Sequence, residues 1–301
     1  MFDGKARSKM NMTKNANGKI KIFAYEMTAP TLLFLLLMTI YPVFFTIYYG
    51  FTNYNYLKGT HPFTGFANYL TLFQNMYFRQ AVWNTVKFTV LAVILEVGLG
   101  LAIALFVKSL KRGQKIVRTL LLLPFLLPAV TVALIWRMML SPNYGIVTQL
   151  FTTLGLPVYN WFYDTKTAFP TLLIIDVWQN APFAFLLIYA HLQGVPESQY
   201  QAASIDGAGA LQRFWHITLP NIGNGIALCA MLRTIDTFRL FEKVNILTGG
   251  GPANTTTTIT QFMYTYGIKT LKFGFASACA IVMTIFVLVM SAVYIKKAMR
   301  T

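Results

Sequence analysis

The sequence predicts an all-α membrane protein with six transmembrane helices and both termini in the cytoplasm. Of its 301 residues, 56% are hydrophobic and only 11% are charged, whereas charged residues make up about 25% of an ordinary soluble domain. Apolar runs of about 20 residues, the length at which a helix crosses a bilayer, recur along the chain. Basic residues are concentrated in segments that would share one membrane face.

Six segments are expected to cross the membrane as helices. The polar, basic segment 1–28 precedes the first of them. The apolar run that follows is too long for a signal peptide and has no small-residue cleavage site, so we expect it to be retained. The fifth segment is the weakest by hydropathy because it contains Arg233 and Asp236. The expected spans are approximately residues 29–51, 83–107, 117–140, 169–191, 221–240 and 275–295.

The distribution of positive charge orients these helices. The chain has 25 lysines and arginines against 9 acids, a formal net charge of +16. Six, five and three of the basic residues lie in segments 1–28, 108–118 and 296–301, whereas the loops after the first and third spans contain only Lys58, Arg79 and Lys166. An even number of spans places all three basic segments in the cytoplasm. The charge therefore indicates topology and attraction to anionic membrane lipid. The basic segments are not interleaved with aromatic residues that could stack on bases, so nucleic acid is not an expected partner.

The connection between the fourth and fifth spans, residues 194–220, is long but has only Arg213 as a basic residue. Pro196 suits the first turn of a helix, and Asp206-Gly207 is typical of a turn. We therefore expect two short helices separated by a break. An ordinary interfacial hairpin explains this pattern. A segment that docks into a groove of another protein is the alternative, since its small residues allow close approach.

The same connection resembles the EAA loop in permease subunits of binding-protein-dependent ABC importers. In that pattern E-A-A is followed after three residues by G, and after nine more by I-x-L-P. Every spacing is present here. Glutamine replaces the usual glutamate, which keeps the length and an acceptor oxygen but removes a charge and any salt bridge made through it. The expected coupling residues are Gln201, Ala202, Ala203, Asp206, Gly207, Ala208, Ile217, Leu219 and Pro220.

Three further stretches, 118–150, 177–196 and 247–264, resemble the carbohydrate-uptake branch of these permeases, of the maltose and multiple-sugar type. The resemblance covers approximately residues 83–295 and implies the type I ABC importer permease fold. It divides the chain into a cytoplasmic arm (1–28), a first helix with an external loop (29–80), a five-helix core (81–295) that contains the EAA loop (194–220), and a cytoplasmic tail (296–301).

The resemblance also implies a set of partners. A second homologous permease would complete the translocation path, two copies of a cytoplasmic ABC ATPase would bind the EAA loops, and an extracytoplasmic solute-binding protein would deliver an oligosaccharide. The chain has no G-x-x-x-x-G-K-[ST] motif, so ATP and Mg²⁺ are expected in the ATPase. No catalytic triad or zinc spacing is evident, and we expect a transport subunit without a cofactor or metal rather than an enzyme. The implied location is a prokaryotic cytoplasmic (inner) membrane.

Ionisable residues within spans often line a cavity or pair with one another. Glu96 is expected to make a buried, hydrogen-bonded packing contact, and Asp176 and Asp236 suit either role. Arg233 in the path would favour an anionic saccharide such as a uronate oligomer, unless Asp236, three residues on, cancels its charge. Aromatic side chains suit the apolar faces of sugars. The candidates for the path are Tyr41, Phe45, Asp176, Trp178, Asn180, Phe183, Arg233, Asp236 and Phe238.

Other functions fit less well. A stand-alone secondary transporter or channel would use an ion gradient, but the EAA spacing argues against it. An intramembrane enzyme would need catalytic residues clustered near one membrane face, and none is evident. A solute of the glycerol-phosphate type is an alternative within the same branch. The sequence names neither the sugar nor its charge.

Overall fold

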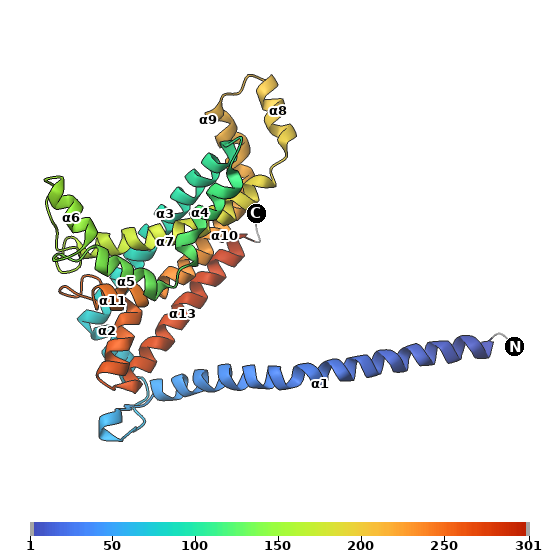
Figure 1. The fold of residues 1–301 in the computed structure, drawn as a ribbon. Helices are drawn as coiled ribbons and strands as arrows, with labels where there is room; N and C mark the ends of the chain where they lie inside the picture. Colours follow the sequence, from blue (N-terminus) through green and yellow to red (C-terminus); the bar gives the residue numbers. More distant parts are fainter. Residues whose placement is uncertain (1–2, 299–301) are drawn as a thin grey trace.

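The computed structural model describes residues 3–298, which are helical apart from the connecting loops (Figure 1). No strand is present among these residues; two isolated bridges, Thr52–Phe63 and Asn55–Thr60, close the loop after the first helix. The all-α fold class is therefore confirmed. The ends of the predicted cytoplasmic arm and tail, residues 1–2 and 299–301, lie outside the described residues.

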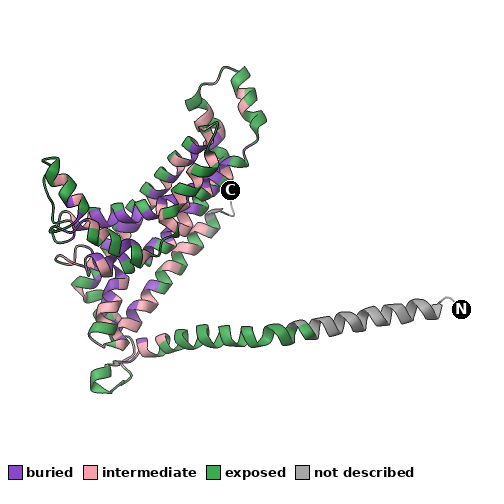
Figure 2. Ribbon diagram, in the orientation of Figure 1, coloured by how far each residue is buried: buried purple, intermediate pink, exposed green. Residues whose placement is uncertain are grey.

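Helix α1 (Asp3–Gly50) is a single helix of 48 residues that runs away from the remaining helices (Figure 1). The predicted boundary at residue 28 between the cytoplasmic arm and the first span lies within this continuous helix and stays a prediction. Side chains from residue 25 to residue 45 that the structure describes are exposed (Figure 2). Only the C-terminal end of α1 reaches the bundle, where it packs against α13 near Gly50. An apolar helix this exposed needs lipid or another chain around it.

Four further helices form the bundle: α3 (Met76–Ser109), α7 (Ala168–Gln193), α10 (Leu219–Phe238) and α13 (Phe273–Ala298). The segments Tyr25–Gly50, Met76–Ser109, Ala168–Gln193 and Phe273–Tyr294 are long and apolar enough to cross a membrane. They correspond to the first, second, fourth and sixth predicted spans. Helix α10 has the expected place and 20 residues, but its charged side chains keep it outside that apolar group.

The third predicted span is not one continuous helix. Residues 117–140 belong to α4 (Gln114–Leu126) and α5 (Ala129–Met139), which meet at an angle of 90°. Leu127 between them is extended (φ −76°, ψ 137°), because proline at the next position, Pro128, disfavours the helical conformation and has no N–H to donate. The freed carbonyl of Leu127 accepts a hydrogen bond from Gln179 Nε2 on α7 at 2.8 Å. The count of six spans stays a prediction, with the bent pair as the third span and α10 as the fifth.

Short helices lie at the two ends of the bundle (Figure 1). At the end expected outside the cell are α2 (Ala67–Gln74), α6 (Ile146–Thr153), α11 (Glu242–Leu247) and α12 (Ile259–Tyr264), together with the short turns η1 (Tyr56–Lys58) and η3 (Thr265–Lys269). The opposite end carries α8 (Glu197–Ile205), α9 (Ala210–Arg213) and the π-helical turn η2 (Phe214–Thr218). The EAA-like segment therefore projects from the end that the charge distribution assigns to the cytoplasm.

Helices α3 and α7 make the most extensive contact in the bundle. They approach closely at Gly100, where a Cβ atom would lie 2.7 Å from both the Ala184 Cβ and the Phe185 amide nitrogen. Small residues at such crossings let helix backbones approach each other in membrane proteins. This crossing holds α7, and with it the start of the EAA-like segment, against α3.

Candidate functional site

The EAA-like segment folds as two short helices with a turn between them. Pro196 precedes α8, and Glu197 occupies its first turn, where a carboxylate interacts favourably with the helix dipole. Helix α8 ends at Ile205 with Asp206 as its C-cap, and Gly207 takes the left-handed conformation with φ +76°. The amide of Ala208 then donates to the Ala203 carbonyl at 2.8 Å. The expected break at Asp206-Gly207 is therefore present, in the αL form that glycine favours at the end of a helix.

The tip of this segment exposes apolar side chains. Ile205 is 87% exposed and Leu211 is 71% exposed. Gln201 and Ala202 are also exposed, whereas Ala203 is half-buried. Exposed apolar groups on a short, projecting hairpin suit a surface that another protein covers. This arrangement is what a docking segment needs, and an ordinary interfacial hairpin would not need to place Ile205 at its most exposed point.

The I-x-L-P part of the motif lies where the segment joins α10. Residues 214–218 form the π-helical turn η2, in which the Leu219 amide donates to the Phe214 carbonyl five residues earlier. Pro220 occupies the first turn of α10, where its missing N–H costs little. Ile217 packs against the apolar cluster between α3 and α7. The motif thus fixes a widened turn, a kind of turn that is frequent at functional sites, between the projecting hairpin and the bundle.

A second feature is a buried charge network inside the bundle. Glu96 on α3, Asp176 on α7, Arg233 on α10 and Lys243 on α11 are each at most 4% exposed. Arg233 Nε donates to Glu96 Oε2 at 2.7 Å, and its Nη2 donates to Glu96 Oε1 at 3.2 Å. This bidentate arrangement is the strong form of an arginine–carboxylate pair. It joins two helices through residues that lie 137 positions apart in the chain.

Asp176 extends the network to α11. Its Oδ1 atom accepts from Lys243 Nζ and, at 3.0 Å, from Asn180 Nδ2. Its Oδ2 atom lies 4.0 Å from Arg233 Nη2. Asp236, the acid expected to pair with Arg233, lies 3.6 Å from Arg233 Nη1 and 3.2 Å from Arg239 Nη2.

The Arg233–Asp236 pair is therefore present, but Glu96 is the closer partner of the guanidinium. Formal charges within the network cancel, since Glu96, Asp176 and Asp236 balance Arg233, Arg239 and Lys243.

The structure brings some of the path candidates together and leaves others apart. Asp176, Asn180, Arg233 and Asp236 meet in the network. Trp178 is 41% exposed and packs edge-on against Trp136, with ring centroids 5.5 Å apart. Phe183 is half-buried and packs against Phe125, with ring centroids 5.2 Å apart. Tyr41 and Phe45 lie on the exposed part of α1. Within this chain they are therefore not neighbours of the network.

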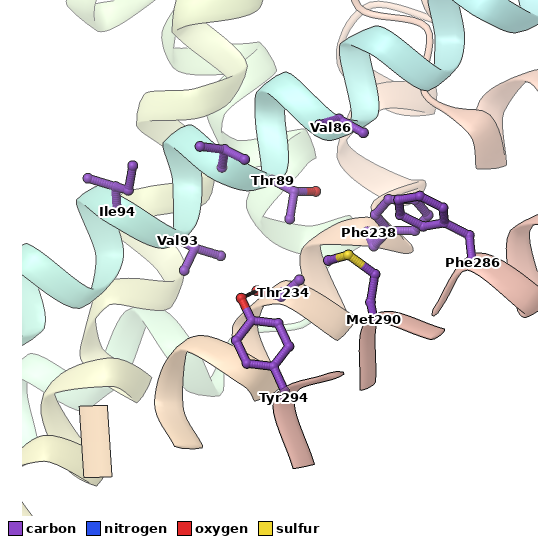
Figure 3. A pocket seen from close by; sticks show the side chains of 10 residues that line it. Val86, Thr89, Val93, Ile94, Thr234, Phe238, Phe286, Met290 and Tyr294 are labelled. Carbon is purple, nitrogen blue, oxygen red and sulfur yellow. Dashed lines mark hydrogen bonds between the residues drawn. The ribbon is translucent and has the colours of Figure 1, made fainter. Parts of the chain in front are cut away.

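Phe238 instead lines an apolar cavity of about 300 Å³ between α3, α10 and α13 (Figure 3). Its ring stacks on Phe286 with centroids 4.9 Å apart. The hydroxyl of Tyr294 points toward Thr234, 3.4 Å from its Oγ1 (Figure 3). Phe238 is itself only 3% exposed. We therefore assign it to the packing of α10 against α13 rather than to the network.

Sequence reasoning missed one member of the site and left the partner of another open. Glu96, the one acid in the second span, was expected to make a buried, hydrogen-bonded packing contact, and its partner is Arg233. Lys243 was not considered because it follows the fifth span, and nothing local shows that it turns back to Asp176. Among the described residues, no group of three or more His, Cys, Asp or Glu side chains could hold a metal ion.

Comparison with known proteins agrees with this geometry. Residues 96–296 match the family described as binding-protein-dependent transport system inner membrane component. The trehalose/maltose transport system permease protein MalF of Thermococcus litoralis is 34% identical, over 95% of this chain and 98% of its own. The sulfoquinovosyl glycerol transport system permease protein SmoG of Agrobacterium fabrum is 33% identical, over 92% and 90% of the two chains.

A solved structure shows the same fold. It is a bacterial ABC transporter involved in the import of the acidic polysaccharide alginate, and it superimposes with a TM-score of 0.83 at 24% identity, covering 95% of this chain and 98% of that one. The family match covers well over half of the chain, including the part of α3 from Glu96 onward, α7, α10 and the EAA-like segment. The chain therefore belongs to the binding-protein-dependent transport system inner membrane components, the multi-pass permease subunits of ABC importers, and is a transport subunit rather than an enzyme.

Proposed function

We propose that this subunit forms one half of a translocation path for an oligosaccharide without formal charge, in a prokaryotic cytoplasmic membrane. The observation that carries the proposal is the state of Arg233. Its guanidinium makes a bidentate pair with Glu96 and lies near two more carboxylates, so it offers no uncompensated positive charge to an anionic solute. Relatives are named for uncharged and anionic solutes alike. Similarity to these relatives therefore does not distinguish an uncharged from an anionic solute, whereas the charge of the path does.

The proposed path follows α7 and α10. Asn180 and Asp236 offer hydrogen-bonding groups, and Trp178 and Phe183 offer aromatic faces on the same helices. This combination suits pyranose rings, which have hydroxyl rims and apolar C–H faces. Tyr41 and Phe45 would contribute only where α1 reaches the second permease. Asp176 and Arg233 are buried and would hold the path-lining side chains in position rather than contact the solute.

Helices α8 and α9 would dock on the partner ATPase, which would bind ATP and Mg²⁺ itself. The exposed apolar tip and the left-handed Gly207 support this role, with Gln201, Ala202, Ala203, Asp206 and Ala208 around the bend. We propose a complex with a second homologous permease, two ATPase copies and a solute-binding protein. Because Gln201 is uncharged, docking would proceed without the salt bridge that a glutamate could make. Both termini would lie in the cytoplasm after six spans.

The test is the ATPase activity of the reconstituted complex with a panel of loaded solute-binding proteins. We expect stimulation by a binding protein loaded with an uncharged oligosaccharide, and little by one loaded with a uronate oligomer. Stimulation only by the uronate would refute the proposed charge of the path. Stimulation only by a glycerol-phosphate-type solute would favour that alternative. A stand-alone transporter would instead show gradient-driven uptake with this chain alone.

A further inference from the structure

Tyr200 occupies an unusual place in the segment that projects from the bundle. It lies on α8, one residue before the EAA-like triplet, yet its ring is half-buried and turned back toward the bundle. Its hydroxyl lies 3.0 Å from Thr218 Oγ1 in the π-helical turn η2. The Thr218 hydroxyl in turn donates to the Arg213 carbonyl at 3.4 Å. Since one hydroxyl has one proton to donate, Tyr200 is the donor to Thr218.

This contact is part of a closed ring of hydrogen bonds. Arg213 Nη1 donates to Ser204 Oγ at 3.0 Å. Ser204 Oγ then donates to the Tyr200 carbonyl at 2.8 Å. The ring therefore runs from Tyr200 through Thr218, Arg213 and Ser204 back to Tyr200. It links α8 to α9 and η2 across the Gly207 bend, so an independent pivot of the two short helices about that glycine would break these bonds.

A lysine joins the same tyrosine to two other helices. Lys108, in the last turn of α3, places its Nζ 4.4 Å from the centroid of the Tyr200 ring. The same Nζ lies 3.5 Å from the Leu192 carbonyl near the end of α7. An ammonium over an aromatic face is attracted to it, and a cation near a helix C-terminus is favoured by the dipole. Tyr200 is the one aromatic residue of α8, and through its ring a basic side chain of α3 contacts this helix.

We propose that Tyr200 is a positioning residue that makes α8 and α9 move as one body with α3 and α10, so that displacement of the hairpin reaches the translocation path. This inference rests on the proposed docking of the hairpin on an ATPase. The hydroxyl would transmit motion to α10 through η2, and the ring would transmit it to α3 through Lys108. Loss of either contact would let the hairpin move without an equal movement of α3 and α10.

The test measures the amount of solute transported per ATP hydrolysed by the complete complex in proteoliposomes. Tyr200→Phe keeps the ring but removes the donor to Thr218, and we expect the transport ratio to fall about fivefold, the size of effect that one hydrogen bond produces. Thr218→Val should lower the ratio similarly, and Thr218→Ser should restore it. The double variant of Tyr200→Phe and Thr218→Val should be no worse than Thr218→Val alone, since Thr218→Val already removes the bond to Tyr200 together with the bond to the Arg213 carbonyl.

Matched controls come from the neighbouring helices. Tyr189 on α7 also donates its hydroxyl, to Gln114 Oε1 at 3.3 Å, and Arg118 on α4 lies over its ring at 5.3 Å. Tyr189 belongs to the apolar cluster against which Tyr200 packs, but the hydrogen bond and the cation–π contact join only α4 and α7. Tyr189→Phe and Arg118→Met should therefore keep the transport ratio within about twofold of the original, whereas Lys108→Met should lower it.

Two results would overturn the inference. One is a Tyr200→Phe complex whose transport ratio equals that of Tyr189→Phe. The other is a Tyr200→Phe chain that no longer co-purifies with the ATPase, which would make the tyrosine part of the docking contact. If the unaltered chain itself does not co-purify with the ATPase, the proposed function is wrong and the positioning role falls with it.

Discussion

The Arg233–Glu96 pair makes a quantitative prediction about the stability of the bundle. Both side chains are at most 5% exposed, and the pair has two hydrogen bonds, at 2.7 and 3.2 Å. Removing one partner leaves the other as an uncompensated buried charge, which costs about 3–5 kcal/mol. For a chain of this size, where each kcal/mol shifts the melting temperature by about 2 °C, Arg233→Met should lower Tm by about 6–10 °C.

A double-mutant cycle tests whether this cost arises from the interaction between Arg233 and Glu96. Glu96→Met should destabilise by a similar amount, since Arg233 would keep only more distant carboxylates. The double variant removes one positive and one negative charge together, and replacing a whole buried pair by apolar residues is often close to neutral. We therefore expect a coupling energy of at least about 2 kcal/mol between the two positions.

Thermal unfolding of the purified chain in detergent, followed by intrinsic fluorescence or by loss of solubility on heating, measures the four proteins of the cycle. Arg239→Met is the matched control, since Arg239 also pairs with Asp236 but its side chain is 62% exposed. An exposed pair contributes less than about 1 kcal/mol. Additive effects in the cycle, or an Arg233→Met protein as stable as the control, would refute the buried pairing.

Three further predictions concern other contacts. Gly100→Ala should lower Tm by several degrees, because its Cβ would lie 2.7 Å from the backbone of α7. Gly98→Ala is the control and should not lower Tm, because its Cβ would meet nothing within 4 Å. Equal Tm values for the two variants would show that α3 and α7 cross less closely than this. Lys243→Met should destabilise by about 2–4 kcal/mol, because Asp176 then keeps only an amide donor and a distant guanidinium; chemical denaturation measures this, and a loss below about 1 kcal/mol would contradict it. Gln201→Glu should change stability by no more than about 0.5 kcal/mol since the side chain is exposed, and a larger Tm shift would show an internal contact at this position.

The EAA-like segment was predictable because its determinants are local. Pro196, Asp206-Gly207 and the I-x-L-P sequence act within one helical turn, so their spacing sets the helix, the bend and the start of α10. The structure confirms the break at Gly207 and the two short helices. That these residues bind an ATPase is a statement about another chain and stays a prediction.

The buried charge network was only partly predictable. Arg233 and Asp236 share a helix face and were paired from their spacing. Glu96 and Lys243 come from elements 137 and 67 positions away from their partners, and which residues meet across a bundle depends on helix rotation and depth. The sequence pattern does not determine helix rotation or depth closely enough to identify these partners. It does indicate that a charged residue in an apolar helix has some partner.

The bend between α4 and α5 illustrates a different limit. Pro124 and Pro128 are visible in the sequence, and each can break a helix. Hydropathy nevertheless favours one continuous span, because it measures transfer into the bilayer and not backbone geometry. At the 90° bend the Leu127 carbonyl accepts a hydrogen bond from Gln179 on α7, a tertiary contact that no local pattern reveals.

The central claim is that this chain moves an uncharged oligosaccharide only as part of an ATP-driven complex. Accumulation of a labelled neutral oligosaccharide in proteoliposomes tests it most directly, with the chain reconstituted alone or with the second permease, the ATPase and the loaded solute-binding protein. We predict accumulation only in the complete complex and only with ATP. Uptake by the chain alone, driven by a proton or sodium gradient, would contradict the account.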